Sequence, residues 1–90
     1  MITLQEIQAE MMTLKDWSLE TSSITKTFSF PSFKEALEFV NKVGEIAEKH
    51  SHHPDIMLMQ INVMLSLTTH SEKSVTKKDF DVARDIDQIR

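Results

Sequence analysis

The segment from Ser32 to Pro54 constrains the fold more than any other part of this 90-residue chain. Ser32 begins a capping box, in which its side chain accepts a free backbone N–H and Glu35 reaches back. An apolar stripe with helical spacing follows, made of Phe33, Ala36, Leu37, Val40, Val43, Gly44 and Ala47. Pro54 has no N–H and pushes the residue before it out of helical geometry, so the helix must end before His53. The pattern predicts one long helix over residues 33–49 and a sharp exit loop.

Two shorter helices are predicted near the ends of the chain. Thr3 and Glu6 form another capping box, and the apolar residues that follow have helical spacing, which predicts a helix over residues 4–15. Residues 76–79 open a last helix that runs to about Gln88. Its inward face is made of Phe80, Val82, Ala83 and Ile86.

The segments between these helices have the alternating pattern of β-strands. Residues 17–20 and 23–29 mix β-branched, aromatic and hydroxyl side chains around a Thr-Ser-Ser turn, which predicts a hairpin. A second pair of strands is expected within residues 56–69, with a turn near residues 60–62 and a buried face of Val63, Leu65 and Leu67. The order α-β-β-α-β-β-α predicts a single α+β domain over residues 1–90. We expect a two-layer sandwich, with a four-stranded antiparallel sheet and three helices packed on one face.

Composition argues against several classes of protein. The chain has no cysteine, so we expect no disulfide framework and no thiolate metal site, and we expect the protein in the reducing cytoplasm. The net charge is −4 and the basic residues are scattered, so no nucleic-acid-binding face is expected. The apolar runs are too short for a membrane span. The N-terminus lacks the basic and apolar regions of a secretion signal.

All four histidines of the chain lie near two predicted junctions. His50 is at the C-terminal end of the long helix, where the helix dipole favours an imidazole. His52 and His53 precede the third strand, whereas His70 follows the fourth. If these two strands form a hairpin, their outer ends are neighbours. The imidazoles of His52, His53 and His70 would then meet at one end of the sheet.

Clustered imidazoles favour two kinds of chemistry. Three histidines are a familiar zinc set, with carboxylates available from Glu48, Asp55 or Asp79. However, adjacent residues such as His52 and His53 point in different directions in an extended loop, so we expect no metal. The alternative is proton transfer, because an imidazole both donates and accepts protons near neutral pH. A reaction that expels hydroxide and loses a proton elsewhere needs an acid and a base together, and imidazoles around a flat substrate supply both without a cofactor.

These residues resemble the pterin-4a-carbinolamine dehydratase family. The shared pattern is a glutamate, three residues, His-His-Pro, a later Thr-His, and an aspartate that opens the last helix. Here its positions are Glu48, His52, His53, Pro54, Thr69, His70 and Asp79. The likeness extends to Trp17, to the segment Phe-Ser-Phe-Pro-Ser-Phe before the long helix, and to the last helix, so it covers nearly the whole chain.

The resemblance implies a cytoplasmic hydro-lyase that acts in tetrahydrobiopterin recycling without metal or organic cofactor. The implied reaction is dehydration of 4a-hydroxytetrahydrobiopterin, which aromatic amino-acid hydroxylases produce, to quinonoid dihydropterin. The implied assembly is a homodimer or homotetramer. The implied acid–base set is His52, His53 and His70, with His53 and His70 carrying the protons and His52 orienting the substrate. The implied substrate-binding residues, of which the two acidic ones hold imidazoles or contact the ring, are Glu48, Ser51, Pro54, Thr68, Thr69, Ser71 and Asp79.

Three positions depart from the family pattern. Ile56 stands where an aromatic residue is usual, Gln60 stands where a tyrosine is frequent, and the usual glycine is missing near Ser74. We expect these changes to loosen the pocket wall and to affect substrate affinity more than catalysis. The alternative function is an inactive binding or assembly protein, because relatives include a transcription dimerisation cofactor and Rubisco assembly factors. Such a protein is expected to lose an imidazole, and this chain keeps all three.

Other notable residues are expected to be structural. Gly44 costs the long helix about 1 kcal/mol relative to alanine, which we explain by close approach of another element. Trp17 is expected to pack the first helix on the sheet. The methionines of the third and fourth strands are expected to fill the core or an interface. Asp85 and Asp87 are expected to lie on a solvated helix face.

Overall fold

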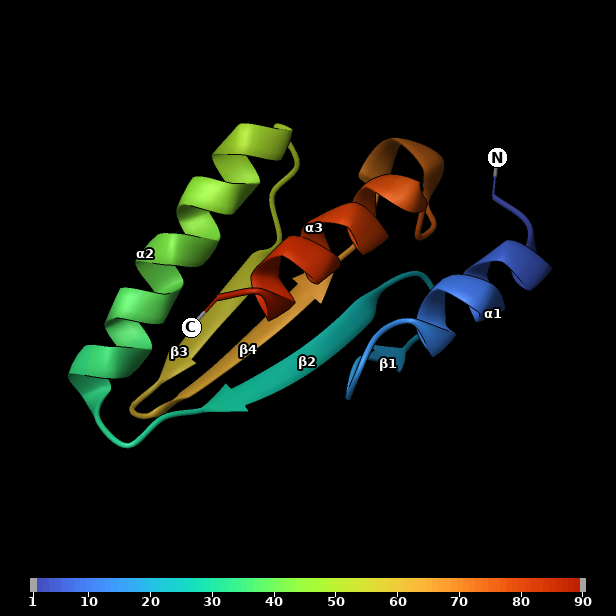
Figure 1. Ribbon diagram of the computed structural model, residues 1–90. Helices are drawn as coiled ribbons and strands as arrows, with labels where there is room; N and C mark the ends of the chain where they lie inside the picture. The colour runs from blue at the N-terminus through green and yellow to red at the C-terminus, as the bar shows by residue number, and fades with distance from the viewer. Residues whose placement is uncertain (1, 90) are drawn as a thin grey trace.

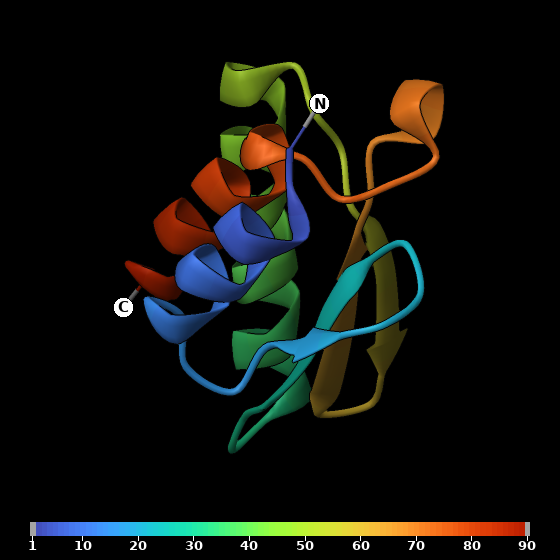
Figure 2. The ribbon, with the colours of Figure 1, turned by 90° about the vertical axis from the view of Figure 1, so that its right-hand side faces the viewer.

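The computed structural model describes residues 2–89 and confirms the α+β architecture. Three helices cover one face of a four-stranded antiparallel sheet, as Figures 1 and 2 show from two directions. The elements in chain order are α1 (Leu4–Met12), β1 (Ser18–Leu19), β2 (Ile24–Ser29), α2 (Phe33–His50), β3 (Asp55–Met59), β4 (Asn62–Leu67), the short 3₁₀ helix η1 (His70–Glu72) and α3 (Lys77–Asp87). The helix η1 is the one element in the described residues that was not predicted.

The two predicted hairpins join through their inner strands, so that the sheet has the order β1-β2-β4-β3. β2 pairs with β4 along its whole length, from Ile24 opposite Leu67 to Ser29 opposite Asn62. β3 pairs with the other side of β4. The short strand β1 and the longer strand β3 are therefore the two edges of the sheet.

Strand β4 carries the centre of the core. Val63, Leu65 and Leu67 have no exposed surface, as their alternation predicted. Burying each of these side chains stabilises the fold by roughly 1.5–3 kcal/mol. The same apolar cluster contains Ala36, Phe39 and Val43 of α2 and Phe80, Val82, Ala83 and Ile86 of α3.

The capping boxes position the helices, although only one of the two first predicted boxes is complete. Thr3 and Glu6 exchange both expected hydrogen bonds at the start of α1. At the start of α2, the Ser32 hydroxyl accepts the Glu35 N–H, but the Glu35 carboxylate accepts the Ser32 hydroxyl rather than a backbone N–H. The second box is therefore only half formed.

Two helix ends differ from the prediction for local reasons. Helix α1 ends at Met12, three residues earlier than predicted, because the Thr13 hydroxyl donates to the Glu10 carbonyl and Asp16 adopts a left-handed φ of 64°. Helix α2 extends to His50, and Ser51 then turns the chain with a φ of 52°. The left-handed Ser51 separates the helix from the His-His-Pro segment.

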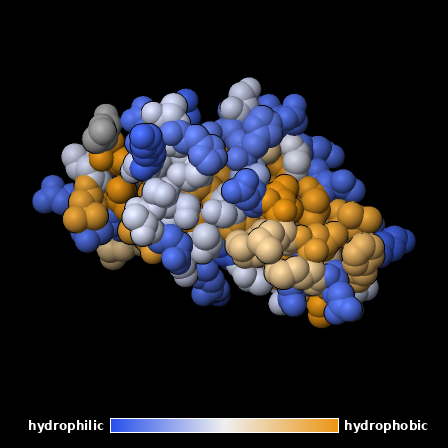
Figure 3. Space-filling view, turned by 180° about the vertical axis from the view of Figure 1, so that it is seen from behind, coloured by the Kyte–Doolittle hydropathy of each residue, from blue (hydrophilic) through white to orange (hydrophobic). Residues whose placement is uncertain are grey.

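Two surface features differ from expectation. The space around the Gly44 Cα is open where a Cβ would be, so the expected close approach of another element is wrong within one copy of the chain. On the sheet face away from the helices, Met57, Met59 and Ile61 are 49%, 46% and 41% exposed, so these two methionines do not fill the core. Figure 3, seen from behind, shows an apolar area on the side of the β3–β4 hairpin. None of the helices within residues 2–89 is long and apolar enough to cross a membrane.

Candidate active site

The β3–β4 register brings the two histidine segments to one end of the sheet, as predicted. Asp55, which follows the His-His-Pro segment, lies opposite Ser66 near the end of β4. The chain then continues through Thr69, which forms an isolated bridge with Ser74, into η1, where His70 is the first residue. Figures 1 and 2 both show the C-terminal end of α2, η1 and the first turn of α3 at the same end of the molecule.

The imidazole of His52 contacts a buried carboxylate of α3. Its Nε2 lies 2.5 Å from Asp79 Oδ1, and the two side chains are 13% and 0% exposed. The second carboxylate oxygen, Oδ2, accepts the Thr69 hydroxyl at 2.9 Å and the Thr76 backbone N–H at 2.8 Å. Asp79 therefore joins the start of α3, the end of β4 and the loop after α2.

His53 pairs with a different carboxylate in a wetter environment. Its Nε2 lies 2.5 Å from Glu48 Oε2, and the two side chains are 60% and 78% exposed. His52 contacts a carboxylate of α3 and His53 contacts a carboxylate of α2, which confirms that these adjacent imidazoles point in different directions. An open hollow of about 840 Å³ lies beside this pair. Its lining includes His53, Glu48, Pro54, Ile56 and Gly44.

His70 is exposed at the start of η1. Its imidazole forms no hydrogen bond or ion pair with any residue in the range 2–89 that the structure describes, which leaves both ring nitrogens accessible to a ligand. Thr69, the chain neighbour of His70, donates to Asp79, and Asp79 contacts the His52 imidazole, so two residues and two hydrogen bonds connect His70 to His52. The three predicted imidazoles thus share one region, and each has a different environment.

The remaining predicted contact residues fall into two groups. The hydroxyls of Thr68 and Thr69 are already engaged, with the Ser22 carbonyl and with Asp79 respectively. Ser51 and Ser71 are exposed beside the histidines, at the end of α2 and within η1. The two serines have the freer hydroxyls for a ligand, whereas Thr69 holds the site together.

The departures from the family pattern lie at different distances from the histidines. Ile56 is half-buried and lines the hollow beside His53. Gln60 lies in the turn between β3 and β4, at the far end of the hairpin, where it adopts a φ of 55°. Within one copy of the chain, Gln60 is therefore away from the histidines, and its expected effect on substrate affinity stays a prediction. Ser74 pairs with Thr69, and the left-handed residue of this segment is Lys73, with a φ of 53°.

His50 lies outside this group. Its Nε2 is 2.6 Å from Asp85 Oδ2, a contact that links the end of α2 to α3. Asp85 therefore has a specific partner, which the expectation of a purely solvated helix face missed. Within residues 2–89, no group of three or more His, Asp or Glu side chains is arranged so that it could hold a metal ion.

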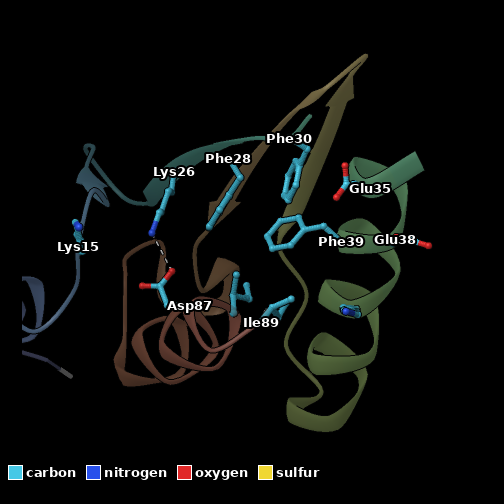
Figure 4. Close-up of a pocket in the computed structure, with 11 residues that line it drawn as sticks. Lys15, Lys26, Phe28, Phe30, Glu35, Glu38, Phe39, Asp87 and Ile89 are labelled. Carbon is cyan, nitrogen blue, oxygen red and sulfur yellow. Dashed lines mark hydrogen bonds and ion pairs between the residues drawn. The ribbon is translucent and has the colours of Figure 1, made fainter. Parts of the chain in front are cut away.

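A second cavity, of about 420 Å³, lies at the other end of the helical layer, and Figure 4 shows its lining. Phe28, Phe30 and Phe39 form its apolar wall, and Lys26 and Asp87 form an ion pair at 3.0 Å beside them. Asp87 also accepts the Trp17 indole N–H, so the prediction that Asp87 is solvated is wrong. No imidazole lines this cavity.

Comparison of this chain with known proteins identifies the family that the histidine arrangement resembles. The family model described as pterin 4 alpha carbinolamine dehydratase matches residues 1–89. A provisionally named pterin-4-alpha-carbinolamine dehydratase from Trichormus variabilis is 48% identical, covering 93% of this chain and 90% of the relative. One from Sulfolobus acidocaldarius is 42% identical, covering 94% and 93%.

Two solved structures share the fold. A transcriptional coactivator/pterin dehydratase from Brucella melitensis superposes with a TM-score of 0.90 at 32% identity, covering 96% of this chain and 94% of that chain. A pterin dehydratase-like protein described as a RuBisCO assembly factor in the alpha-carboxysome superposes with a TM-score of 0.65 at 18% identity, covering 79% and 82%. At that identity the second likeness shows the fold alone.

Proposed function

Because this chain belongs to the pterin-4a-carbinolamine dehydratase family, we propose that it dehydrates 4a-hydroxytetrahydrobiopterin to quinonoid dihydropterin. The observation that carries the proposal is the placement of three histidines at one end of the sheet. His52 and His53 come just before β3, and His70 comes just after β4, at the open end of the β3–β4 hairpin. An acid and a base are both needed at neutral pH, and imidazoles are the side chains that serve as either.

The different exposures of the imidazoles suggest different roles. His53 and His70 are exposed, so each can exchange a proton with water between turnovers. His52 is largely buried and fixed on Asp79, which suits a group that orients the substrate. We therefore assign proton transfer to His53 and His70 and substrate orientation to His52.

The reaction balances without a further reactant. One imidazolium gives a proton to the hydroxyl on C4a, the C4a–O bond breaks, and water leaves. The proton on N5 passes to a neutral imidazole, and the N5 electron pair forms the C4a=N5 double bond. Each turnover leaves the two imidazoles with exchanged protonation states, which solvent then resets. The proposal requires neither a metal nor an organic cofactor.

The remaining residues surround this chemistry. Glu48 supports the His53 imidazole and Asp79 supports His52. In this proposal Ser51, Pro54 and Ser71, together with the backbone of residues 68–71, contact the pterin, which is supported by the exposed side chains of Ser51 and Ser71. The substrate comes from an aromatic amino-acid hydroxylase reaction, and we place the enzyme in the cytoplasm, in line with the absence of cysteine from the sequence.

Self-assembly into a homodimer or homotetramer is part of the proposal. Strand β3 is an edge of the sheet, and its unpaired backbone groups can pair with a second copy. The exposed Met57, Met59 and Ile61 add apolar surface beside that edge. A symmetric pair of β3 strands would give one continuous eight-stranded sheet.

The rival proposal is a dehydratase-like binding or assembly protein without activity. It is favoured by the likeness to the Brucella melitensis protein, which is described as a transcriptional coactivator as well as a pterin dehydratase. A chain selected for binding alone has no need of two exposed imidazoles beside a third that is held by a carboxylate. The retention of His52, His53 and His70 therefore favours the enzyme.

The test is carbinolamine dehydration in vitro by the full chain. We expect His53→Ala and His70→Ala each to lower the rate by about 100-fold or more, the usual contribution of general acid–base catalysis. His50→Ala is the matched control, since His50 pairs with Asp85 outside the site, and it should retain activity. A wild-type protein no faster than the two variants would remove the catalytic assignment and leave the rival.

A further inference from the structure

Thr76 is absent from the predicted site, yet it completes a chain of hydrogen bonds that ends on an imidazole. Its hydroxyl lies 2.7 Å from the Thr69 hydroxyl, which in turn donates to Asp79 Oδ2 at 2.9 Å. A hydroxyl has one hydrogen, and that of Thr69 is used on Asp79. The Thr76 hydroxyl is therefore the donor in the contact with Thr69. This fixes the direction of both bonds.

The other oxygen of Asp79 sets the tautomer of His52. Asp79 Oδ2 accepts from both the Thr69 hydroxyl and the Thr76 backbone N–H, so the carboxylate is surrounded by donors and acts as the acceptor toward His52 as well. The ring nitrogen at 2.5 Å from Oδ1, His52 Nε2, must therefore carry the hydrogen. In the neutral ring, Nδ1 is then an acceptor. Asp79 has no exposed surface, so water does not compete for these positions.

We propose that Thr76 is a positioning residue, whose hydroxyl acts through Thr69 and Asp79 to hold His52 in the Nε2–H form. The arrangement presents His52 Nδ1 as a fixed acceptor for a ring N–H of the pterin. This last step rests on the proposed function, whereas the tautomer does not. His53 differs from His52 in this respect, because its partner Glu48 is 78% exposed and hydrogen-bonds to no other side chain within residues 2–89.

The first measurement needs no substrate. The ¹⁵N spectrum of the four imidazoles distinguishes a ring nitrogen with a hydrogen from one with a free lone pair. In the full chain, His52 is expected to show hydrogen on Nε2 and a lone pair on Nδ1. A wild-type His52 with its hydrogen on Nδ1 overturns the proposal, whatever the variants do.

The variants then test the role of the hydroxyl itself. Thr76→Val removes the donor that fixes the Thr69 hydroxyl, so the Asp79 carboxylate is held less firmly and Oδ1 is no longer kept in line with His52 Nε2. The His52 signals should then shift toward a tautomer mixture, Thr76→Ser should restore them, and His50 should remain unchanged as an internal reference. Thr3→Val is the matched control, because Thr3 occupies the same position in the capping box of α1 without reaching a histidine. If Thr76→Val fails to fold, Thr76→Ala is measured in its place.

The kinetic measurement separates positioning from simple stability. Thr76→Val should raise KM about fivefold, the factor that one neutral hydrogen bond supplies. Its kcat should change by less than about twofold, since an orienting group binds substrate and transition state alike. Thr76→Ser should restore KM. Unchanged His52 signals and unchanged KM in an active, folded Thr76 variant would sink this inference alone, whereas an inactive wild type with the expected spectrum would sink the proposed function alone.

Discussion

Asp55 and Ser66 lie directly opposite each other in the β3–β4 hairpin. This pairing explains how residues far apart in the sequence come to the same end of the sheet, because His52 and His53 come just before Asp55 and His70 comes just after β4. A shift of one residue in the register would move Val63, Leu65 and Leu67 from the core to the open face. The buried side of β4 therefore fixes the position of the histidines.

Loss of the Asp79 carboxylate should destabilise the protein strongly. Asp79→Ala leaves the Thr69 hydroxyl, the Thr76 N–H and His52 Nε2 without their buried acceptor. We expect the free energy of unfolding to fall by about 2–3 kcal/mol, measured by urea denaturation. Asp81→Ala, on the same helix, is the control and should stay within about 0.5 kcal/mol of wild type. Equal effects of the two substitutions would contradict the buried network.

Gly44→Ala should stabilise the chain. The added methyl group meets open space, and alanine is favoured over glycine inside a helix. The expected gain is about 0.5–1 kcal/mol in the free energy of unfolding. The reverse change, Ala9→Gly on the exposed side of α1, gives the scale in the same protein. If Gly44→Ala instead breaks an oligomer, the close approach predicted from the sequence comes from another subunit.

The stability of α1 should depend on pH through Glu6. Hydrogen bonds from the Thr3 backbone N–H and then from the Thr3 side chain lower the pKa of the Glu6 carboxyl below its ordinary value of 4.5. A lowered folded-state pKa means that the stabilisation is complete above 4.5 and is lost as the pH falls through the folded-state value. Glu6→Gln keeps the capping geometry without titrating. The difference in unfolding free energy between wild type and Glu6→Gln should therefore shrink as the pH falls from 6 to 3, and a constant difference would contradict this account.

The oligomer should depend on the β3 edge. Met57→Lys places a charge on the exposed apolar side of β3 and is expected to shift the protein toward monomer in light scattering at micromolar concentration. Met12→Lys is the matched control, since Met12 is 88% exposed on α1, in the other layer. A monomeric wild type, or equal dissociation by both variants, would count against assembly through β3.

The features that the sequence predicted well are those set by local periodicity. The apolar stripe of α2, the alternation in β4 and the stop at Pro54 depend on residues close together in the chain, so the elements were placed within a few residues of their observed ends. The prediction that the third and fourth strands form a hairpin then placed the histidines at one end of the sheet. These inferences needed no knowledge of distant contacts.

The features that the sequence missed depend on partners far apart in the chain. Asp87 looks like a solvated helix residue until Trp17 and Lys26 are seen to contact it. Thr76 was identified only as the start of a helix, although its spacing from Asp79 is a capping signal. That signal predicts the backbone bond but not the second oxygen, which contacts His52. A helical pattern predicts which residues of a helix face the core, but not which distant side chains they contact.

Asp79 performs two tasks with two oxygens: one anchors the first turn of α3 and the other anchors an imidazole. A substitution of Asp79 therefore changes the support of His52 and the start of α3 together, and it cannot alter one without the other. Selection for either property would eliminate the same substitutions. A relative without dehydratase activity could lose His70 without harm to its fold, but it would still need an acid at position 79. An intact aspartate at this position is therefore weaker evidence of activity than an intact histidine at position 70.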